Sequence, residues 1–234
     1  MQKETWSWET TRLASSWPRS LAAPSTVRVS RWGYYGTPVL LMPSAGGDFE
    51  EVERFGLIAA IQGIVASGRV KVFSVDGIAA HSWIQAKASP DESARAQRAW
   101  ETLIYEEVVP HIRRDCHSES IEIYTAGFAY GACSAIGLLC HYPDVFRGAI
   151  AMSMSFGMPV YWPEGRQLTQ LRQRYVQLAC GEGSFERPVY SRELAQALTS
   201  RGVPHHLDLW GRKYAHGWAA WREMLPKYVV TTIA

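Results

Sequence analysis

Five short segments of continuous apolarity constrain the fold of this chain more than any other feature. They cover residues 39–42, 70–75, 121–125, 149–152 and 175–179. A strand is apolar throughout when both of its faces are buried, as in the middle of a parallel sheet. Helical periods occupy much of the remaining chain, at residues 51–66, 93–114, 133–141, 191–201 and 218–228. The alternation predicts an α/β fold, in which helices cover both faces of a mostly parallel sheet.

Three further segments complete the predicted sheet. Residues 6–13 and 26–32 alternate polar and apolar side chains, which is typical of antiparallel strands with one exposed face. Residues 206–210 supply a last strand, so we expect eight strands in all. No internal repeat, charged linker or low-complexity tract interrupts the pattern, and we expect a single domain over residues 1–234.

Charge and cysteine usage narrow the classes of partner. The 24 basic and 22 acidic residues are interspersed and leave a net charge of +2, so we expect no basic face for nucleic acid or anionic lipid. No apolar run is long enough for a signal peptide or a membrane-spanning helix. Cys116, Cys133, Cys140 and Cys180 form no C-x-x-C pair, which favours reduced, buried thiols. These features predict a cytoplasmic protein whose partner is a small, neutral or weakly charged molecule.

The segment Gly127-Phe128-Ala129-Tyr130-Gly131 lies between a predicted strand and a predicted helix. This is the setting of the G-x-S-x-G nucleophile elbow, in which a serine stands at the apex of a sharp turn. Small flanking residues let strand and helix approach each other, and the apex residue adopts strained backbone angles. Alanine holds the apex here, so the hydroxyl that would begin the chemistry is missing.

Candidate partners for the elbow follow the later strands. In α/β hydrolases an acid follows a late strand and a histidine follows the last one. His216 comes just after residues 206–210, and Glu182 and Glu186 lie on the loop after residues 175–179. A histidine at that place can act as a general base for an apex hydroxyl, while a carboxylate fixes its tautomer. On this reasoning either glutamate could be the acid.

Several segments together resemble one family. Residues 36–49, 75–76, 105–110, 127–131 and 216–221 are similar to the esterase branch of the α/β hydrolases, relatives of esterase D and the antigen 85 acyltransferases. The resemblance implies the α/β-hydrolase fold, and it covers most of the chain. It places the nucleophile at the position of Ala129 and the base at His216. The usual family form at the base is His-Asp-Trp, from which Gly217 departs.

The same resemblance ranks the acids and locates an oxyanion hole. Some relatives carry a Gly-x-Gly-x-aromatic-Glu segment, which makes Glu186 the first choice for the acid and Glu182 the reserve. In α/β hydrolases the hole uses the amide that follows the nucleophile and an amide from the loop after the third strand. Those amides correspond here to Tyr130 and to Ala45 or Gly46.

Three tryptophans lie on loops that we expect to overhang the site. Trp83, Trp162 and Trp218 are predicted to line an apolar pocket for an acyl or aryl group. The segment 153–174 is short, so we expect a small or absent cap and an open pocket.

Neither a cofactor nor a metal ion is predicted. His205 and His206 are adjacent in a strand and therefore point to opposite faces, which argues against a shared metal. The pair Gly181-x-Gly183 lacks the third glycine of a dinucleotide fingerprint.

Alanine at the apex admits three interpretations. The first, which we favour, is a serine esterase or acyltransferase inactivated by a Ser→Ala substitution at Ala129, since all the expected partners are retained. The second is a natural pseudohydrolase that binds a small ligand or a protein without catalysis. The third is weak turnover in which His216 activates water. The sequence does not decide the ester, the acyl acceptor or whether the chain forms a homo-oligomer.

Overall fold

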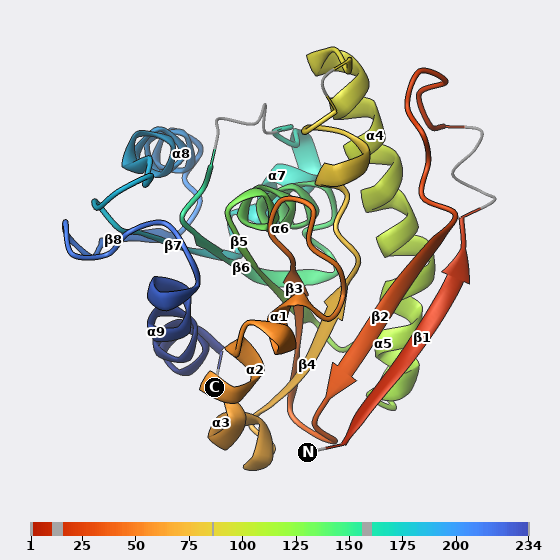
Figure 1. Ribbon diagram of the computed structural model, residues 1–234, viewed down its shortest axis with the longest axis horizontal. Helices are drawn as coiled ribbons and strands as arrows, with labels where there is room; N and C mark the ends of the chain where they lie inside the picture. The colour runs from red at the N-terminus through yellow and green to blue at the C-terminus, as the bar shows by residue number, and fades with distance from the viewer. Residues whose placement is uncertain (1, 11–15, 86, 156–160, 234) are drawn as a thin grey trace.

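One eight-stranded sheet forms the centre of the structure, a computed structural model that describes residues 2–10, 16–85, 87–155 and 161–233 (Figure 1). The strand order is β1-β2-β4-β3-β5-β6-β7-β8. The strands are β1 (Lys3–Glu9), β2 (Thr26–Trp32), β3 (Thr37–Met42), β4 (Val70–Val75), β5 (Ile123–Phe128), β6 (Phe146–Met152), β7 (Tyr175–Cys180) and β8 (His205–Leu209). The pairs β1–β2 and β2–β4 are antiparallel, and all the other pairs are parallel. The predicted α/β-hydrolase fold, with antiparallel strands at its N-terminal edge, is confirmed.

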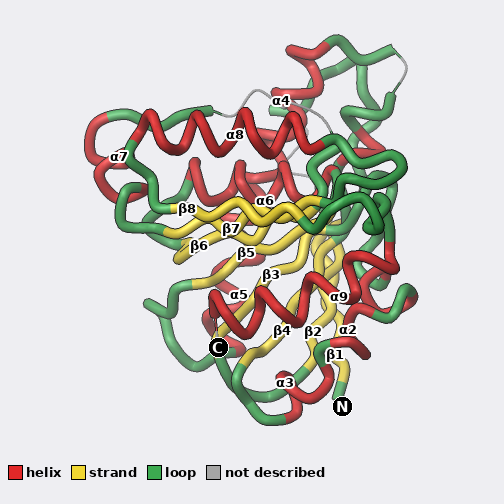
Figure 2. The backbone as a smooth tube through the Cα atoms, turned by 90° about the vertical axis from the view of Figure 1, so that its left-hand side faces the viewer, coloured by secondary structure: helices red, strands yellow, loops and turns green. Residues whose placement is uncertain are grey.

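The helices cover both faces of this sheet (Figure 2). One face packs against α4, α5, α6, α7 and α8, and the other packs against α1, α2, α3 and α9. Their bounds are α1 (Glu51–Arg54), α2 (Leu57–Ala60), α3 (Gln62–Ala66), α4 (Pro90–Leu103), α5 (Val109–Asp115), α6 (Tyr130–His141), α7 (Gly165–Leu171), α8 (Pro188–Arg201) and α9 (Trp218–Tyr228). Shorter helical turns are η2 (Ala79–His81), η3 (Ile104–Val108) and η4 (Val229–Ile233).

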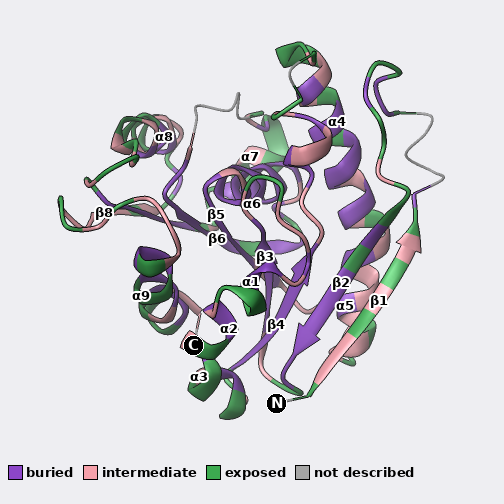
Figure 3. Cartoon of the chain, in the orientation of Figure 1, coloured by how far each residue is buried: buried purple, intermediate pink, exposed green. Residues whose placement is uncertain are grey.

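The central strands are apolar because both of their faces are buried. In β3, Leu40 and Met42 point into one core, whereas Val39 and Leu41 point into the other. Figure 3 shows these central strands buried, while exposed and half-buried residues alternate along β1. Continuous apolarity therefore marks the strands that are buried on both faces, and alternation marks the edge strand with one exposed face.

The continuous helix predicted over residues 51–66 is wrong. The structure has three short helices there, and Gly56 between the first two has a φ of +78°. That left-handed conformation cannot continue an α-helix, and glycine adopts it at little cost.

The helix predicted over residues 93–114 is also interrupted. It divides into α4 and α5, and the π-helical turn η3 lies between them. Pro110 stands in the first turn of α5. Proline has no N–H to donate to the preceding turn, and its ring crowds the carbonyl four residues earlier, so the regular ladder fails at this place.

The first strand covers Lys3–Glu9, and Leu13, where the predicted strand ended, lies outside the described residues. Within the described ranges, no helix has both the length and the apolarity needed to cross a bilayer.

The carboxyl ends of the parallel strands meet at one edge of the sheet. Met42 pairs with Gly127, Phe128 pairs with Met152, and Cys180 pairs with Leu209. The loops that follow β3, β5, β6, β7 and β8 therefore begin side by side. Ligand sites of parallel sheets lie at this edge.

Candidate active site

Ala129 stands at the sharp turn between β5 and α6. Its backbone angles are φ 53° and ψ −114°, and its exposed fraction is 4%. A positive φ is costly for a residue with a Cβ atom and persists where the surrounding structure imposes it. The amide of Ala129 donates a hydrogen bond of 3.0 Å to the carbonyl of Met152, which ties the turn to the end of β6. The strained apex expected from the sequence is present.

The two glycines of the turn are required by close backbone contacts. A Cβ atom on Gly127 would lie 2.1 Å from the carbonyl oxygen of Gly131. A Cβ atom on Gly131 would lie 2.3 Å from the carbonyl oxygen of Met42. Side chains at either place would push α6 away from the sheet, so the small residues bring the start of α6 against β3 and β5.

His216 and Glu186 form a pair on two neighbouring loops. The Nδ1 atom of His216 lies 3.4 Å from the Oε2 atom of Glu186. The amide of His216 donates a hydrogen bond of 3.0 Å to the carbonyl of Ser184, which fixes the spacing of the loops. The side chain of Glu186 is fully buried, whereas 22% of the His216 side chain is exposed. The pair therefore presents an accessible imidazole in front of a buried carboxylate.

Glu186 is held as a carboxylate by several donors. The hydroxyl of Ser153 donates a hydrogen bond of 2.6 Å to Oε1, and the amide of Gly181 donates one of 3.3 Å to the same atom. The thiol of Cys180 lies 3.3 Å from Oε2. Burial by itself would raise the pKa of Glu186, but the hydrogen bonds from His216, Ser153 and Cys180 outweigh it and lower that pKa below its ordinary value. An ionised carboxylate is the form that stabilises a neighbouring imidazolium.

The structure separates the two candidate acids. Glu182 is one-third exposed and forms an ion pair of 3.1 Å with Arg192, on the outside of the loop. Glu186 alone of the two contacts His216.

Ser153 is a site residue that sequence reasoning missed. It follows β6 directly, is fully buried, and has a φ of 52°. The available signal was its place at the carboxyl end of a buried strand, beside the strands that carry the elbow and the acid.

Aromatic contacts connect the histidine to the elbow. The ring of Trp221 lies 5.1 Å from that of His216 and 5.4 Å from that of Phe128, the residue before Ala129. Trp218 packs edge-on against Trp221 and stacks on Phe55 with ring centroids 4.3 Å apart. Trp218 therefore lies near the elbow.

The loop expected to supply oxyanion donors lies beside the first turn of α6. A Cβ atom on Gly131 would lie 2.4 Å from the carbonyl oxygen of Pro43, so this loop and the helix touch. Ala45 and Gly46 are exposed at its tip, and Gly46 has a φ of 73°. Tyr130 opens α6, and helix N-termini point backbone N–H groups outward. Tyr130 thus follows the elbow apex directly, and the loop that carries Ala45 and Gly46 contacts the helix that Tyr130 opens, through Pro43.

Trp83 and Trp162 have different surroundings. Trp83 is half-buried on the loop after η2, and the neighbouring Ile84 reaches to 3.9 Å from the position of a Cβ atom on Gly46. The loop that carries Trp83 therefore approaches the candidate oxyanion loop.

Trp162 does not lie at this edge. Its ring lies 4.1 Å beneath the guanidinium of Arg201, at the end of α8. Since α8 begins two residues after Glu186, its length of about 20 Å separates Trp162 from the acid. The physical reason is topological, because a connection between the parallel strands β6 and β7 must return to the opposite edge of the sheet. The prediction of Trp162 as a pocket residue is not kept.

Two cavities open at the edge that carries the elbow. One of about 380 Å³ is lined by residues that include Tyr214, His216 and Trp218. The other, of about 270 Å³, includes Gly46 and Gly47 from the candidate oxyanion loop, together with Asp48 and His81. Both have the size of a small substrate fragment.

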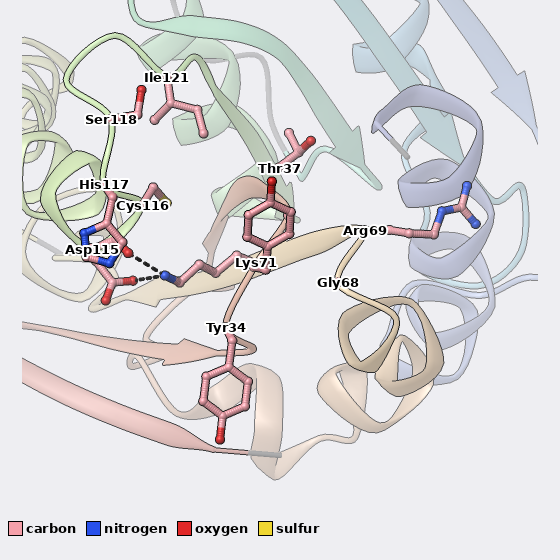
Figure 4. A pocket seen from close by; sticks show the side chains of 12 residues that line it. Tyr34, Thr37, Gly68, Arg69, Lys71, Asp115, Cys116, His117, Ser118 and Ile121 are labelled. Atoms are coloured by element: carbon pink, nitrogen blue, oxygen red, sulfur yellow. Dashed lines mark hydrogen bonds and ion pairs between the residues drawn. The ribbon is translucent and has the colours of Figure 1, made fainter.

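A cavity of about 580 Å³ lies at the opposite edge, where β3 and β4 begin. Figure 4 shows the Lys71 ammonium paired with Asp115 in its wall, at 2.6 Å from the carboxylate and 2.7 Å from the backbone carbonyl. Arg31 also contacts Asp115, at 3.1 Å. Glu4 also pairs with Arg31, at 2.8 Å, so two carboxylates face these two cations, and this cavity is remote from His216.

Other polar residues have structural partners. Asp208 accepts hydrogen bonds from Lys227 and from the Tyr228 hydroxyl, which is 2.7 Å away. In the part of the chain that the structure describes, no group of three or more His, Cys, Asp or Glu side chains is arranged to hold a metal ion.

A family described as "Putative esterase" matches residues 35–232. The chain belongs to this esterase family. No curated protein sequence matches it. Among solved structures, it is similar to a ferulic acid esterase, with a TM-score of 0.73, 15% identity, and coverage of 99% of this chain and 97% of that one. For S-formylglutathione hydrolase (FrmB) from Staphylococcus aureus the TM-score is 0.65 and the identity 12%, over 100% and 96% of the two chains.

MPT51 (FbpC1) from Mycobacterium tuberculosis is also similar to this esterase-family chain. The TM-score is 0.62 and the identity 18%, over 92% of this chain and 97% of that one. At these identities the solved structures establish the fold. The family match extends across the elbow, the His216 loop and the Glu186 loop, and it supports a hydrolase scaffold.

Proposed function

We propose that this chain is a carboxylic-ester hydrolase or acyltransferase scaffold of the serine-hydrolase type, with Ala129 at the position of the nucleophile. The observation that carries the proposal is the strained apex at Ala129 beside an intact His216–Glu186 pair. In this assignment His216 is the general base and Glu186 orients it. A small ester is the substrate.

Each group has a role in the proposed reaction, which a serine at the apex would perform. His216 would accept the hydroxyl proton as the oxygen attacks the ester carbonyl, and the ionised Glu186 would stabilise the resulting imidazolium. Backbone amides of Tyr130 and of Ala45 or Gly46 would stabilise the oxyanion. His216 would then return the proton to the leaving alcohol. The side chain of Ala129 has no hydroxyl, so the chain as it stands forms no acyl-enzyme at this position.

The two cavities suggest where the halves of an ester bind. The leaving alcohol must lie near His216, since that side chain protonates it. The cavity with Tyr214 and Trp218 is therefore assigned to the alcohol. Trp83 is assigned to the neighbourhood of the oxyanion loop, as an expected wall of the acyl side.

Restoring the hydroxyl tests the proposal. The Ala129→Ser variant should hydrolyse short p-nitrophenyl esters with a kcat/KM at least about 10³-fold above that of the unaltered chain. Ala219→Ser is a matched control, because residue 219 lines the His216 cavity but lies outside the elbow. That control should not gain activity. A folded but inert Ala129→Ser variant would argue against a catalytic role for this site.

A second candidate function is ligand or partner binding without catalysis, and Ala129 itself favours it. In this case the Ala129→Ser variant stays inert, while the unaltered chain still binds its ligand. The codon of the natural gene at this position separates an inactivating substitution from a natural alanine.

A further inference from the structure

A buried carboxylate lies directly behind the candidate oxyanion loop. Glu51 is 5% exposed. Its Oε2 atom accepts a hydrogen bond of 2.7 Å from the backbone N–H of Ser44, and its Oε1 atom accepts one of 2.7 Å from the Ser44 hydroxyl. Both carboxylate oxygens are therefore engaged by the first residue of the loop.

The same carboxylate fills the space next to Gly47. A Cβ atom on Gly47 would lie 2.4 Å from both oxygens of Glu51, so no larger residue fits at that place without displacing the carboxylate. Further bonds close the turn, because Gly47 donates one of 3.1 Å to the Ser44 carbonyl and accepts one of 3.1 Å from the Gly77 amide. The turn is thus held at both ends, while Ala45 and Gly46 at its tip stay exposed.

Glu51 differs from the acidic residues around it. Glu50 and Glu53 form ion pairs with Lys3 at the surface, whereas Glu51 forms no ion pair with any described residue. Burial raises the pKa of Glu51, against the lowering effect of the Ser44 donors. A buried carboxylate without an ion-pair partner is costly, and an apolar side chain would fill the same space at a lower cost in free energy. Its geometry therefore points to a task other than packing.

We propose that Glu51 is a positioning residue that fixes the Ser44–Gly47 turn, so that the Ala45 and Gly46 amides face the ester carbonyl. This inference rests on the proposed function. An oxyanion hole acts through donors that are already oriented when charge develops, so a loosened turn should lower kcat more than it raises KM.

The test uses the Ala129→Ser background with Glu51→Gln as the main variant. The amide keeps the shape of the side chain but removes its negative charge, and its Nε2 atom donates where a carboxylate oxygen accepted, so the Ser44 hydroxyl has to change from donor to acceptor. We expect kcat to fall by about 10- to 100-fold, with a smaller change in KM. This fall in kcat is smaller than the loss caused by deleting one oxyanion donor, because the amides remain but are less well oriented. Ser44→Ala removes one of the two bonds and should give an intermediate loss. If Glu51→Gln does not fold, the Ser44→Ala variant still tests whether the hydrogen bonds between these two residues affect kcat.

Glu101→Gln is the matched control. Glu101 is equally buried, but it pairs with His141 between α4 and α6. The Glu101→Gln variant should lower the melting temperature while leaving kcat within about twofold of the parent. This result would separate an effect on positioning from a loss of stability. If kcat in Glu51→Gln and Ser44→Ala stays within twofold of the parent, the inference is wrong and the proposed function stands.

A second readout does not need turnover. A p-nitrophenyl alkylphosphonate monoanion mimics the charged oxygen, and calorimetry measures its affinity for the unaltered Ala129 chain. Glu51→Gln should weaken that affinity by about tenfold, through the loss of oriented amide hydrogen bonds to an anion. Equal affinities would overturn the inference. An inert Ala129→Ser parent together with no phosphonate binding would overturn the proposed function and, with it, the inference.

Discussion

Among the residues that the structure describes, two histidine–glutamate pairs with buried carboxylates lie at opposite ends of α6. One joins His216 to Glu186 beside the elbow at the start of α6, and the other joins His141, the last residue of α6, to Glu101 in α4. In the first pair the histidine side chain is 22% exposed, while in the second it is 9% exposed. The Glu101 carboxylate also accepts a hydrogen bond of 2.9 Å from Gln97.

The difference shows that pairing alone does not make a catalytic site. Both carboxylates can orient an imidazole, but only His216 lines a cavity at the edge of the sheet where the strained elbow lies. His141 lies about 18 Å further along the helix, packed between two helices. We therefore assign catalysis to the first pair and helix packing to the second, and paired substitutions can separate these roles.

The largest expected effect is the loss of the base. In the Ala129→Ser background, His216→Ala should lower kcat by about 10⁴-fold or more, because the hydroxyl loses its proton acceptor. His141→Ala should leave kcat within about threefold. Steady-state kinetics with a p-nitrophenyl ester measure both. Retained activity in His216→Ala would remove His216 from the mechanism.

Loss of the acid should have a smaller effect. Glu186→Gln should lower kcat by about 10³-fold, since the imidazolium loses its counter-charge and the histidine its fixed tautomer. Glu182→Gln is the matched control on the same loop and should stay within about twofold, because Glu182 points to Arg192. The opposite ranking in the kinetic assay would exchange the roles of the two glutamates.

The free energy of unfolding should fall most when the Glu101–His141 pair is broken. Glu101→Ala leaves His141 without its partner inside the protein, and breaking a buried pair typically costs about 3 kcal/mol of the free energy of unfolding. Urea unfolding measures the loss. A change below about 1 kcal/mol would mean that the Glu101–His141 pair contributes little to holding α4 against α6.

The smallest expected effect is a dependence of folding stability on pH. The folded-state pKa of Glu186 lies below its ordinary value of 4.5, so the ionised form stabilises the fold above about pH 4.5. That contribution is lost as the pH falls through the folded-state pKa. Urea unfolding of the parent between pH 3 and 6 should show this decrease, and Glu186→Gln should show a shallower one. If the stability of the parent and of Glu186→Gln changed with pH in parallel, the lowered pKa of Glu186 would be contradicted.

Much of this site could be predicted because its parts follow strands directly. Buried strands are recognisable from continuous apolarity, and parallel strands end at one edge, so the loops carrying Ala129, Glu186 and His216 had to meet. Contacts between distant segments could not be predicted in this way. Ser153 and Glu51 meet their partners only when distant or neighbouring loops fold together; the position of Ser153 after a buried strand was its one signal, and the sequence around Glu51 gives none.

The errors arose where local backbone chemistry or topology decided the outcome. Gly56 divided a helical period that is otherwise regular, and Pro110 produced a π-helical turn within another. Trp162 was expected near the site because it follows β6, but the chain had already crossed to the other edge to begin β7.

Covalent labelling at position 129 tests the central claim most directly. A fluorophosphonate forms a stable adduct only with an activated hydroxyl, so Ala129→Ser should gain the mass of one phosphonyl group, and peptide mapping should locate it at residue 129. The unaltered chain and the Ala129→Ser/His216→Ala double variant should gain none. A folded Ala129→Ser variant that stays unlabelled would contradict the assignment of this elbow to a serine-hydrolase site.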